Sequence, residues 1–469
     1  MVPVARSSEV PTVSCLRMDT RDFSPNRFIL PALFVAIALA ALISLIAEAN
    51  RNPDEFHHLA AVHYYITHFF PPTIGDPEVR DAYSVWGTSY LDFQWLEYFL
   101  AGKFIWLFRS LAGSELLAAR FFNVALFAGM VIFFAVRSRT DRNALIIPAL
   151  FLITPQVWYI FGYFNNDAFA LFVAALLGYQ IVSPTSAANN YLNNRRLFGY
   201  GAIWFGLLVG TLLICKSNYW IFLAFAGISL VLKRHLSIEL TSKFAVIGLL
   251  ALTVLGARIG LDLYANGETN FVGVSYISFL CTGTLRGGSR LRALQEEIAQ
   301  PPFKASTLEN DPDGTDPSVN LRAKGVGITE LFSKWKFHTQ SFKSFVGVYG
   351  YMDKTAASLY YASFAGLYLF FGGYLVFSVA RSRDTDVLIQ FFLLAAGVFA
   401  TFLIALLLSW TFAFQAQGRY LFPLIPMLGV FVYTNRRLLS GRYINIFLSA
   451  AFLLSLYSFI FVGILRINE

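Results

Sequence analysis

Charged residues are scarce in this sequence. Only 14% of the 469 residues are Asp, Glu, Lys or Arg, whereas soluble globular proteins carry about 25%. Hydrophobic residues make up 57% of the chain. This composition excludes an ordinary water-soluble enzyme.

Cysteine is also rare, and the three that are present (Cys15, Cys215 and Cys281) show no CxxC or Cys/His spacing. Their pattern indicates neither a disulfide framework nor a zinc site. The net charge of +8 is compatible with nucleic-acid binding, but in a membrane protein Lys and Arg first report topology. We therefore expect no nucleic-acid partner.

Long apolar runs recur along the chain, such as residues 28–47 and 387–408. A helix needs about 20 apolar residues to cross the hydrocarbon core. We therefore predict an all-α polytopic membrane protein with about eleven transmembrane helices. The expected spans are residues 28–48, 115–136, 144–160, 167–183, 197–214, 219–232, 243–262, 357–380, 387–410, 420–434 and 443–465.

The distribution of basic residues predicts the orientation. The first apolar run has no small-residue cleavage site at its end, so it is expected to be an uncleaved span that follows a cytoplasmic tail, residues 1–27. The basic clusters then all lie on the cytoplasmic side, as the positive-inside rule requires. They are found at 137–142, 195–196, 233–234, 381–383 and 436–442.

This topology predicts four regions. The tail 1–27 is followed by a transmembrane core, 28–264, which includes a first outer loop, 49–114. A large outer loop, 265–356, leads to C-terminal transmembrane helices, 357–469.

Both outer loops are expected to contain interfacial helices. Residues 92–111 are apolar but carry four charged residues, and each charge at mid-bilayer costs roughly 2.5–3.5 kcal/mol. In the second loop, residues 328–345 keep helical apolar spacing. They form either an amphipathic helix on lipid headgroups or a helix that packs on a soluble subdomain.

The first polar group that needs explaining follows the first span, at PDEFHH (53–58). With Asn52 as N-cap, this segment is a good helix start. The alternative is a pair of carboxylates, Asp54 and Glu55, at the mouth of a membrane cavity, where burial tunes a catalytic base. His58 lies one turn from Asp54 and is placed to orient it.

Three further outer turns carry ionisable residues. Asp167 in FNND (164–167) is either a helix cap or a site residue, and Lys216 in KSNYW (216–220) either extends to water or binds a ligand. Arg419 in QAQGRY (415–420) is expected to open a helix, where its charge opposes the macrodipole. An arginine beside free helix N–H groups suits a phosphate oxygen. Arg120, inside the second span, also needs a partner, for which Glu97 and Glu115 are the simplest candidates.

Four motifs in order, PDEFHH, FNND, KSNYW and QGRYLFPLIP (417–426), resemble the GT-C class of integral-membrane glycosyltransferases. The likeness is to a bacterial branch with a PDExxH first loop and a QGRYxxP late motif. It runs through essentially the whole chain, including RFFNVALFAG (120–129) and SFVGVYGYMD (344–353). One departure is QWLEYFL (94–100), which stands where such proteins often carry a Pro-Pro-Leu-Tyr-like surface helix.

The resemblance implies a sugar donor carried on a polyprenyl phosphate. It also implies chemistry on the outer face of the bacterial inner membrane, with a cell-envelope glycan, lipid or protein as acceptor. Asp54 matches the first-loop catalytic carboxylate, and Arg419 the arginine associated with the donor phosphate. We expect Glu55 and His58 to assist catalysis and a further set to bind substrate: Arg120, Asp167, Lys216, Gln417 and Tyr420. The resemblance leaves open whether Asp54 and Asp167 hold a divalent metal, Mg or Mn.

The expected reaction is an inverting transfer in which Asp54 deprotonates the acceptor hydroxyl and Arg419 stabilises the leaving phosphate. Two alternatives remain. A transporter or flippase of lipid-linked sugars would place its ionisable groups near the bilayer midplane, whereas those found here lie at the outer boundary. An assembly protein with a degenerate site is the third possibility.

Overall fold

The computed structural model describes residues 28–93, 95–234, 237–271 and 288–469. The proposed tail 1–27, Cys15, Cys281 and Gln94 lie outside the described residues. The described chain folds into helices, apart from one two-stranded ribbon, β1 (Val348–Tyr349) and β2 (Lys354–Thr355). The prediction of an all-α protein is confirmed.

Among the described residues, seven helical stretches are long and apolar enough to cross a membrane. Two of them join consecutive helices: α8 (Asp167–Val182) with α9 (Ala187–Asn193), and α21 (Gly441–Ser458) with the π-helical η7 (Phe459–Ile464). The other five are single helices: α1 (Ile29–Ile46), α5 (Glu115–Arg137), α12 (Ile238–Asn266), α18 (Ser358–Ser382) and α19 (Thr385–Thr411).

The expected count of about eleven spans is not supported, because the four remaining segments are short or broken. Two of them are the single helices α10 (Tyr200–Cys215) and α11 (Trp220–Leu232), the latter after the turn η3 (Ser217–Tyr219). Segment 420–434 contains only η6 (Gly418–Leu421) and α20 (Leu424–Thr434). Segment 144–160 is divided into α6 (Ile146–Ala149), η2 (Leu150–Ile153) and α7 (Pro155–Gly162).

The break in segment 144–160 has a local cause. Thr154 is extended, with φ −148° and ψ 133°, and its side chain accepts a hydrogen bond from the backbone N–H of Gln156. Pro155 occupies the first position of the next helix, where its missing N–H costs nothing. A Thr-Pro pair therefore ends one helix and caps another inside an apolar run.

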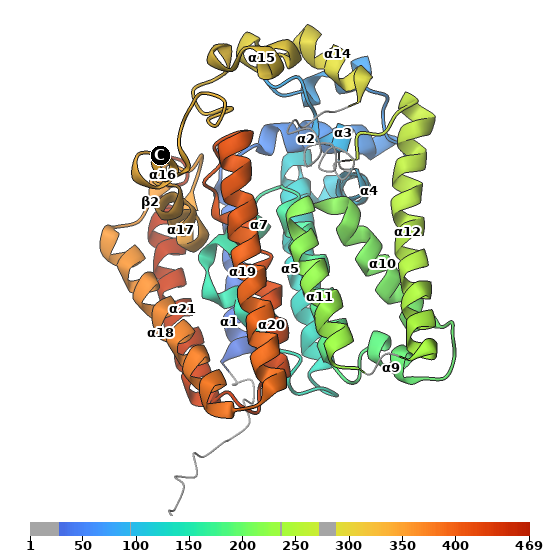
Figure 1. The fold of residues 1–469 in the computed structure, drawn as a ribbon. Helices are drawn as coiled ribbons and strands as arrows, with labels where there is room; N and C mark the ends of the chain where they lie inside the picture. The colour runs from blue at the N-terminus through green and yellow to red at the C-terminus, as the bar shows by residue number, and fades with distance from the viewer. Residues whose placement is uncertain (1–27, 94, 235–236, 272–287) are drawn as a thin grey trace, which may run out of the picture.

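The bundle has one end rich in loops and one end with short turns (Figure 1). The loop-rich end carries two groups of elements. The first group follows α1: α2 (Glu55–Thr67), η1 (Pro77–Ala82), α3 (Tyr90–Phe93) and α4 (Leu96–Ala112). The second precedes α18: α14 (Ser289–Ile298), η4 (Pro301–Phe303), α15 (Ala305–Asn310), η5 (Pro312–Gly314), α16 (Ile328–Ser333) and α17 (Phe337–Gly347).

The two segments that were expected to form interfacial helices have different structures. Helix α4 packs on α2 and α5 and leaves Trp106 and Leu107 exposed. The apolar stripe of 328–345 is broken into α16 and α17 at Lys336, which has φ +50°. Leu331 and Phe337 of this stripe are buried in a cluster with Leu406 of α19. The stripe thus packs on protein rather than on a lipid surface.

Large apolar side chains are found both in the core of the bundle and on its outer surface. Helix α8 lies at the centre and contacts α5, α10 and α20, and almost every residue in it is buried. The outer helices expose large apolar side chains such as Leu249, Leu369 and Phe399. Exposed apolar surface of this extent is expected only where lipid covers the protein.

Candidate active site

Asp54 lies where the chain leaves α1 and enters α2. It is the N-cap residue of α2, with a left-handed φ of +59°, and its side chain makes no capping hydrogen bond. The sequence suggested Asn52 as the cap, but Asn52 instead donates a hydrogen bond to the Glu55 carboxylate at 2.9 Å. The Asp54 carboxylate is therefore free to face other groups.

Arg419 joins Asp54 to a second carboxylate. Its Nη2 atom lies 3.2 Å from Asp54 Oδ2, and its Nη1 atom lies 3.8 Å from Asp167 Oδ2. Lys216 forms an ion pair with Asp167 and donates a hydrogen bond to Asn166 Oδ1 at 3.0 Å. Four turns that are distant in the sequence thus contribute an alternating row of charges: Asp54, Arg419, Asp167 and Lys216.

The turn that carries Arg419 is fixed by close packing on α17. Gly418 donates its backbone N–H to Ser344 Oγ at 2.9 Å, and a Cβ atom at Gly418 would lie 2.1 Å from the backbone nitrogen of Phe345. Only glycine fits this contact. Arg419 is expected to open a helix, and it lies in the first turn of the short 3-10 helix η6, while α20 begins only at Leu424. The carboxylates of Asp54 and Asp167 lie against its charge.

Glu55 has a different environment from its neighbour Asp54. Its carboxylate is buried and accepts hydrogen bonds from Arg120 Nε at 2.8 Å, from Arg120 Nη2 at 2.6 Å and from the backbone N–H of Phe164 at 3.2 Å. Arg120 also donates to three backbone carbonyls at the end of α1, those of Ser44, Ala47 and Glu48.

The partner of Arg120 is therefore Glu55, not Glu97 or Glu115 as the sequence suggested. Both members of the pair are enclosed by protein, and neither lines the cavity described below. The geometry favours a positioning role for Glu55 and Arg120, since together they fix the exit of α1 and hence Asp54. Their predicted catalytic and binding roles stay predictions.

His58 contacts residues next to the candidate site. Its Nδ1 atom lies 2.6 Å from the Tyr98 hydroxyl, and its ring stacks on Tyr90 with centroids 4.0 Å apart. Burial lowers the pKa of His58 to about 3, so the imidazole is neutral at physiological pH. Tyr90 faces the cavity, and His58 therefore acts on the site through Tyr90.

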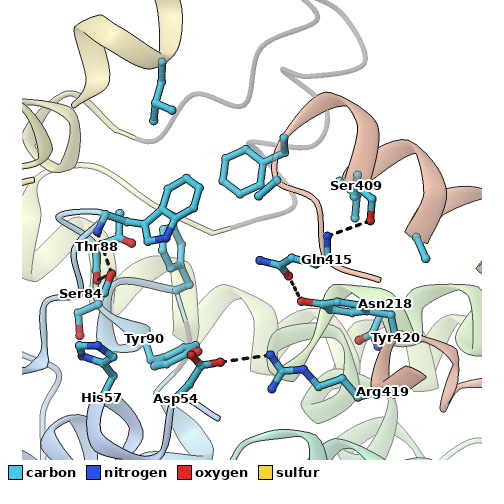
Figure 2. A pocket seen from close by; sticks show the side chains of 18 of the residues that line it. Asp54, His57, Ser84, Thr88, Tyr90, Asn218, Ser409, Gln415, Arg419 and Tyr420 are labelled. Atoms are coloured by element: carbon cyan, nitrogen blue, oxygen red, sulfur yellow. Dashed lines mark hydrogen bonds and ion pairs between the residues drawn. The ribbon is translucent and has the colours of Figure 1, made fainter. Parts of the chain in front are cut away.

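A cavity of about 520 Å³ opens above the Asp54–Arg419 pair. Figure 2 shows His57, Ser84, Thr88 and Tyr90 on the side of Asp54, and Asn218, Ser409, Gln415 and Tyr420 on the side of Arg419. Apolar residues of α11 and α19 extend the second side: Ile221, Ile404, Ala405 and Leu408. Leu291, Arg292, Gln295 and Leu308, from α14 and α15, also belong to the lining.

Several polar atoms at this cavity have no partner among the described residues. They are buried and belong to residues of its lining: His57 Nδ1, Asn218 Oδ1, Asn218 Nδ2 and Arg419 Nε. Buried polar atoms are nearly always hydrogen-bonded in folded proteins. A polar ligand in the cavity would supply the missing partners.

The residues of the QAQGRY motif that line the cavity differ from those predicted. Tyr420 lines the cavity and donates its hydroxyl hydrogen to Gln415 Oε1. Gln415 also lines it, whereas Gln417 does not. Gln415 and Asn218 were not among the predicted site residues, although both belong to motifs that indicated the site. Trp86 and Thr88 stand in a loop without any such motif.

Arg419 holds Asp54 in its charged form. Burial raises the pKa of its carboxyl group, but the charge of Arg419 and its hydrogen bond outweigh this effect, and the pKa lies below its usual value of 3.8. Asp54 is therefore ionised at neutral pH. Burial likewise lowers the pKa of Lys216, against the opposing charge of Asp167.

The two carboxylates considered for a divalent metal do not fit one in this arrangement. The Arg419 guanidinium lies between Asp54 and Asp167, and Lys216 pairs with the second. These cations occupy the positions that a metal would need and would repel it. Within the described ranges, no group of three His, Cys, Asp or Glu residues is arranged to hold a metal ion.

Comparison of the chain with models of protein families, with curated proteins and with solved structures finds no match.

Proposed function

We propose that this protein is a membrane glycosyltransferase that moves a sugar from a polyprenyl-phosphate donor to a hydroxyl group of a cell-envelope glycan, lipid or protein. The observation that carries the proposal is the Asp54–Arg419 pair at the floor of a large cavity. A carboxylate that is ionised at neutral pH and a guanidinium are the two groups that such a transfer needs. The likeness of the four motifs to the GT-C class agrees with this chemistry.

These two side chains account for the proton and the charge that move during the transfer. The acceptor oxygen attacks the anomeric carbon as its proton passes to the Asp54 carboxylate. The bond from that carbon to the phosphate oxygen breaks on the opposite face, and its electron pair leaves with the phosphate. Arg419, with Lys216 nearby, stabilises the charge that gathers on the phosphate. Attack opposite the leaving group inverts the anomeric configuration.

The shape of the cavity suits a donor with a long apolar chain. Helices α11 and α19 pack against each other, and Ile221, Ile404 and Leu408 continue the lining from Arg419 along them. A phosphate held by Arg419 would place its polyprenyl chain against this apolar surface. The headgroup would remain at the loop-rich end of the bundle.

We further propose that the loop-rich end faces the outside of a bacterial inner membrane. The basic clusters at 137–142, 195–196, 233–234, 381–383 and 436–442 lie in turns at the other end. The positive-inside rule places such turns in the cytoplasm. The cavity is then on the face where envelope acceptors are found.

A test should separate transfer from transport of a lipid-linked sugar. Purified protein in proteoliposomes would receive polyprenyl phosphates that carry different radiolabelled sugars, together with envelope extract as acceptor. We expect one of them to release free polyprenyl phosphate and label the extract, and Asp54→Asn to abolish this. Asp313→Asn, an exposed carboxylate of the same end, is the matched control. Movement of intact donor across the bilayer without release would instead indicate a transporter.

A further inference from the structure

The two sides of the cavity differ in charge. The side of Asp54 carries its carboxylate, whereas the polar groups above Arg419 are neutral: Asn218, Ser409, Gln415 and Tyr420 (Figure 2). Arg292 of α14, the other arginine of the lining, forms an ion pair with Glu309. The apolar surface of α11 and α19 continues the neutral side. Neutral hydrogen-bonding groups and an apolar surface therefore lie together on the side of Arg419.

Asn218 brings a side-chain amide to the wall of the cavity. It lies in η3, between Lys216 and α11, and its side chain caps neither helix. Its Oδ1 and Nδ2 atoms are both shielded from solvent, and neither finds a hydrogen-bond partner in the described part of the chain. Burying an amide without partners is unfavourable unless a ligand completes it.

We propose that Asn218 recognises the sugar of the donor, and that this sugar is neutral. The inference rests on the proposed function, because it assigns part of the same cavity. An amide offers donors at Nδ2 and an acceptor at Oδ1, so it can bind two neighbouring ring hydroxyls at once. The Asp and Arg side chains of the lining are already paired, Asp54 with Arg419 and Arg292 with Glu309. A carboxylate or amine on a sugar beside Asn218, Ser409 and Gln415 would therefore find no unpaired opposite charge among them, and its desolvation would be uncompensated.

The neighbouring residues place the sugar in a productive position. Asn218 lies two residues from Lys216 in the sequence, and Lys216 reaches Asp167, which in turn faces Arg419. A sugar bound by Asn218 would therefore lie next to the phosphate site. Asp54, on the other side of Arg419, would then approach from the acceptor side, as an inverting transfer requires.

Binding measurements with two kinds of lipid test this assignment. The probes are bare polyprenyl phosphate and polyprenyl phosphates that carry glucose, galactose, mannose, N-acetylglucosamine or arabinose. We expect the wild type to bind at least one neutral sugar-lipid more tightly than the bare lipid. Asn218→Ala should reduce that added affinity by about 3- to 10-fold, as expected for one or two neutral hydrogen bonds, and should leave the bare lipid unaffected.

Two further variants control for misfolding and for nonspecific effects. Asn218→Leu retains the approximate volume and makes no new polar demand, so it should fold even if the alanine variant does not, and it should lose the same affinity. Asn190→Ala removes an exposed amide at the opposite end of the bundle and should change nothing.

The outcomes separate the two proposals. If the added affinity for a sugar survives in both Asn218 variants, or if no sugar adds affinity, the role of Asn218 is wrong while a phosphate site at Arg419 stands. If the wild type binds no polyprenyl phosphate at all, the proposed function itself fails. Preference for a sugar that carries a carboxylate, added to the same panel, would overturn the neutral assignment.

Discussion

Asp54 and Glu55 are adjacent in the sequence but have opposite environments: the Asp54 side chain is 41% exposed, whereas that of Glu55 is 1% exposed. The left-handed backbone at Asp54 turns the first carboxylate toward the cavity as the second enters the protein. One carboxylate thus faces the cavity, and the other is held inside the protein by Arg120. Substitutions at the two positions should therefore have different consequences.

Asp54→Asn should reduce transfer while leaving the fold intact. The amide keeps the size of the side chain but cannot accept the acceptor's proton, and general-base catalysis contributes about 10²–10⁴-fold. Turnover of the purified variant, measured beside its thermal unfolding, checks this. Transfer close to the wild-type rate would show that Asp54 is not the base.

Glu55→Gln, unlike Asp54→Asn, should destabilise the fold. Removing one charge of a buried ion pair leaves the other uncompensated, which costs about 3–5 kcal/mol. We expect the melting temperature in detergent to fall strongly. Glu115→Gln, which breaks a largely exposed pair with His63, should cost only about 0–1 kcal/mol. Similar melting temperatures for the two variants would contradict the structural role of Glu55.

Arg419→Lys should retain part of the affinity for polyprenyl phosphate, and Arg419→Gln much less. Lysine keeps the charge but lacks the planar fork that binds two phosphate oxygens. A charge-assisted hydrogen bond contributes roughly 1.5–3 kcal/mol, so the glutamine variant should bind about 10–100-fold more weakly. Titration of the lipid into the wild type and both variants measures the difference. Equal affinities would remove Arg419 from the phosphate site.

Stability should depend on pH through His58. Its pKa is about 3 in the folded protein and about 6.5 in the unfolded chain, so the unfolded chain binds more protons between these values. The contribution is complete above pH 6.5 and is lost as the pH falls toward 3. Melting temperatures from pH 7 to pH 4.5 should decline for the wild type. In His58→Gln the decline should be shallower, and an unchanged slope would rule out this origin.

Cysteine labelling tests the orientation. In a protein without Cys15 and Cys281, an impermeant reagent added outside should reach Asp313→Cys but not Asn190→Cys or Asp384→Cys. All three positions are exposed. Asp313 belongs to η5, which follows α15 of the loop-rich end, whereas Asn190 in α9 and Asp384 between α18 and α19 belong to the end with short turns. Labelling of Asn190→Cys from outside would reverse the proposed orientation.

Much of the helical layout was predictable because it depends on local composition. The ends of α5, α18 and α19 lie within two residues of the predicted spans. The failure at 144–160 has a local cause that hydropathy alone does not register: the capping side chain of Thr154, followed by Pro155, divides an otherwise apolar run.

The site was predictable only in part, for a different reason. Motifs at separate turns indicated Asp54, Asp167, Lys216 and Arg419, and the structure brings these four residues together. The sequence did not reveal that Arg120 pairs with Glu55, because that contact depends on how α1 and α5 pack. Asn218 was overlooked because an unpartnered amide is recognised only once its surroundings are known.

The alternating row of charges has a consequence for biosynthesis. Two negative and two positive side chains give the cluster a net charge of zero, but Arg419 lies near the end of the chain and the other three lie before residue 217. Until the hairpin of α19 and α20 is inserted, the partly built bundle holds one unbalanced negative charge at its boundary. Insertion of Arg419 restores electroneutrality, so the charge balance of the site is reached once α20 is in place, before α21 is inserted.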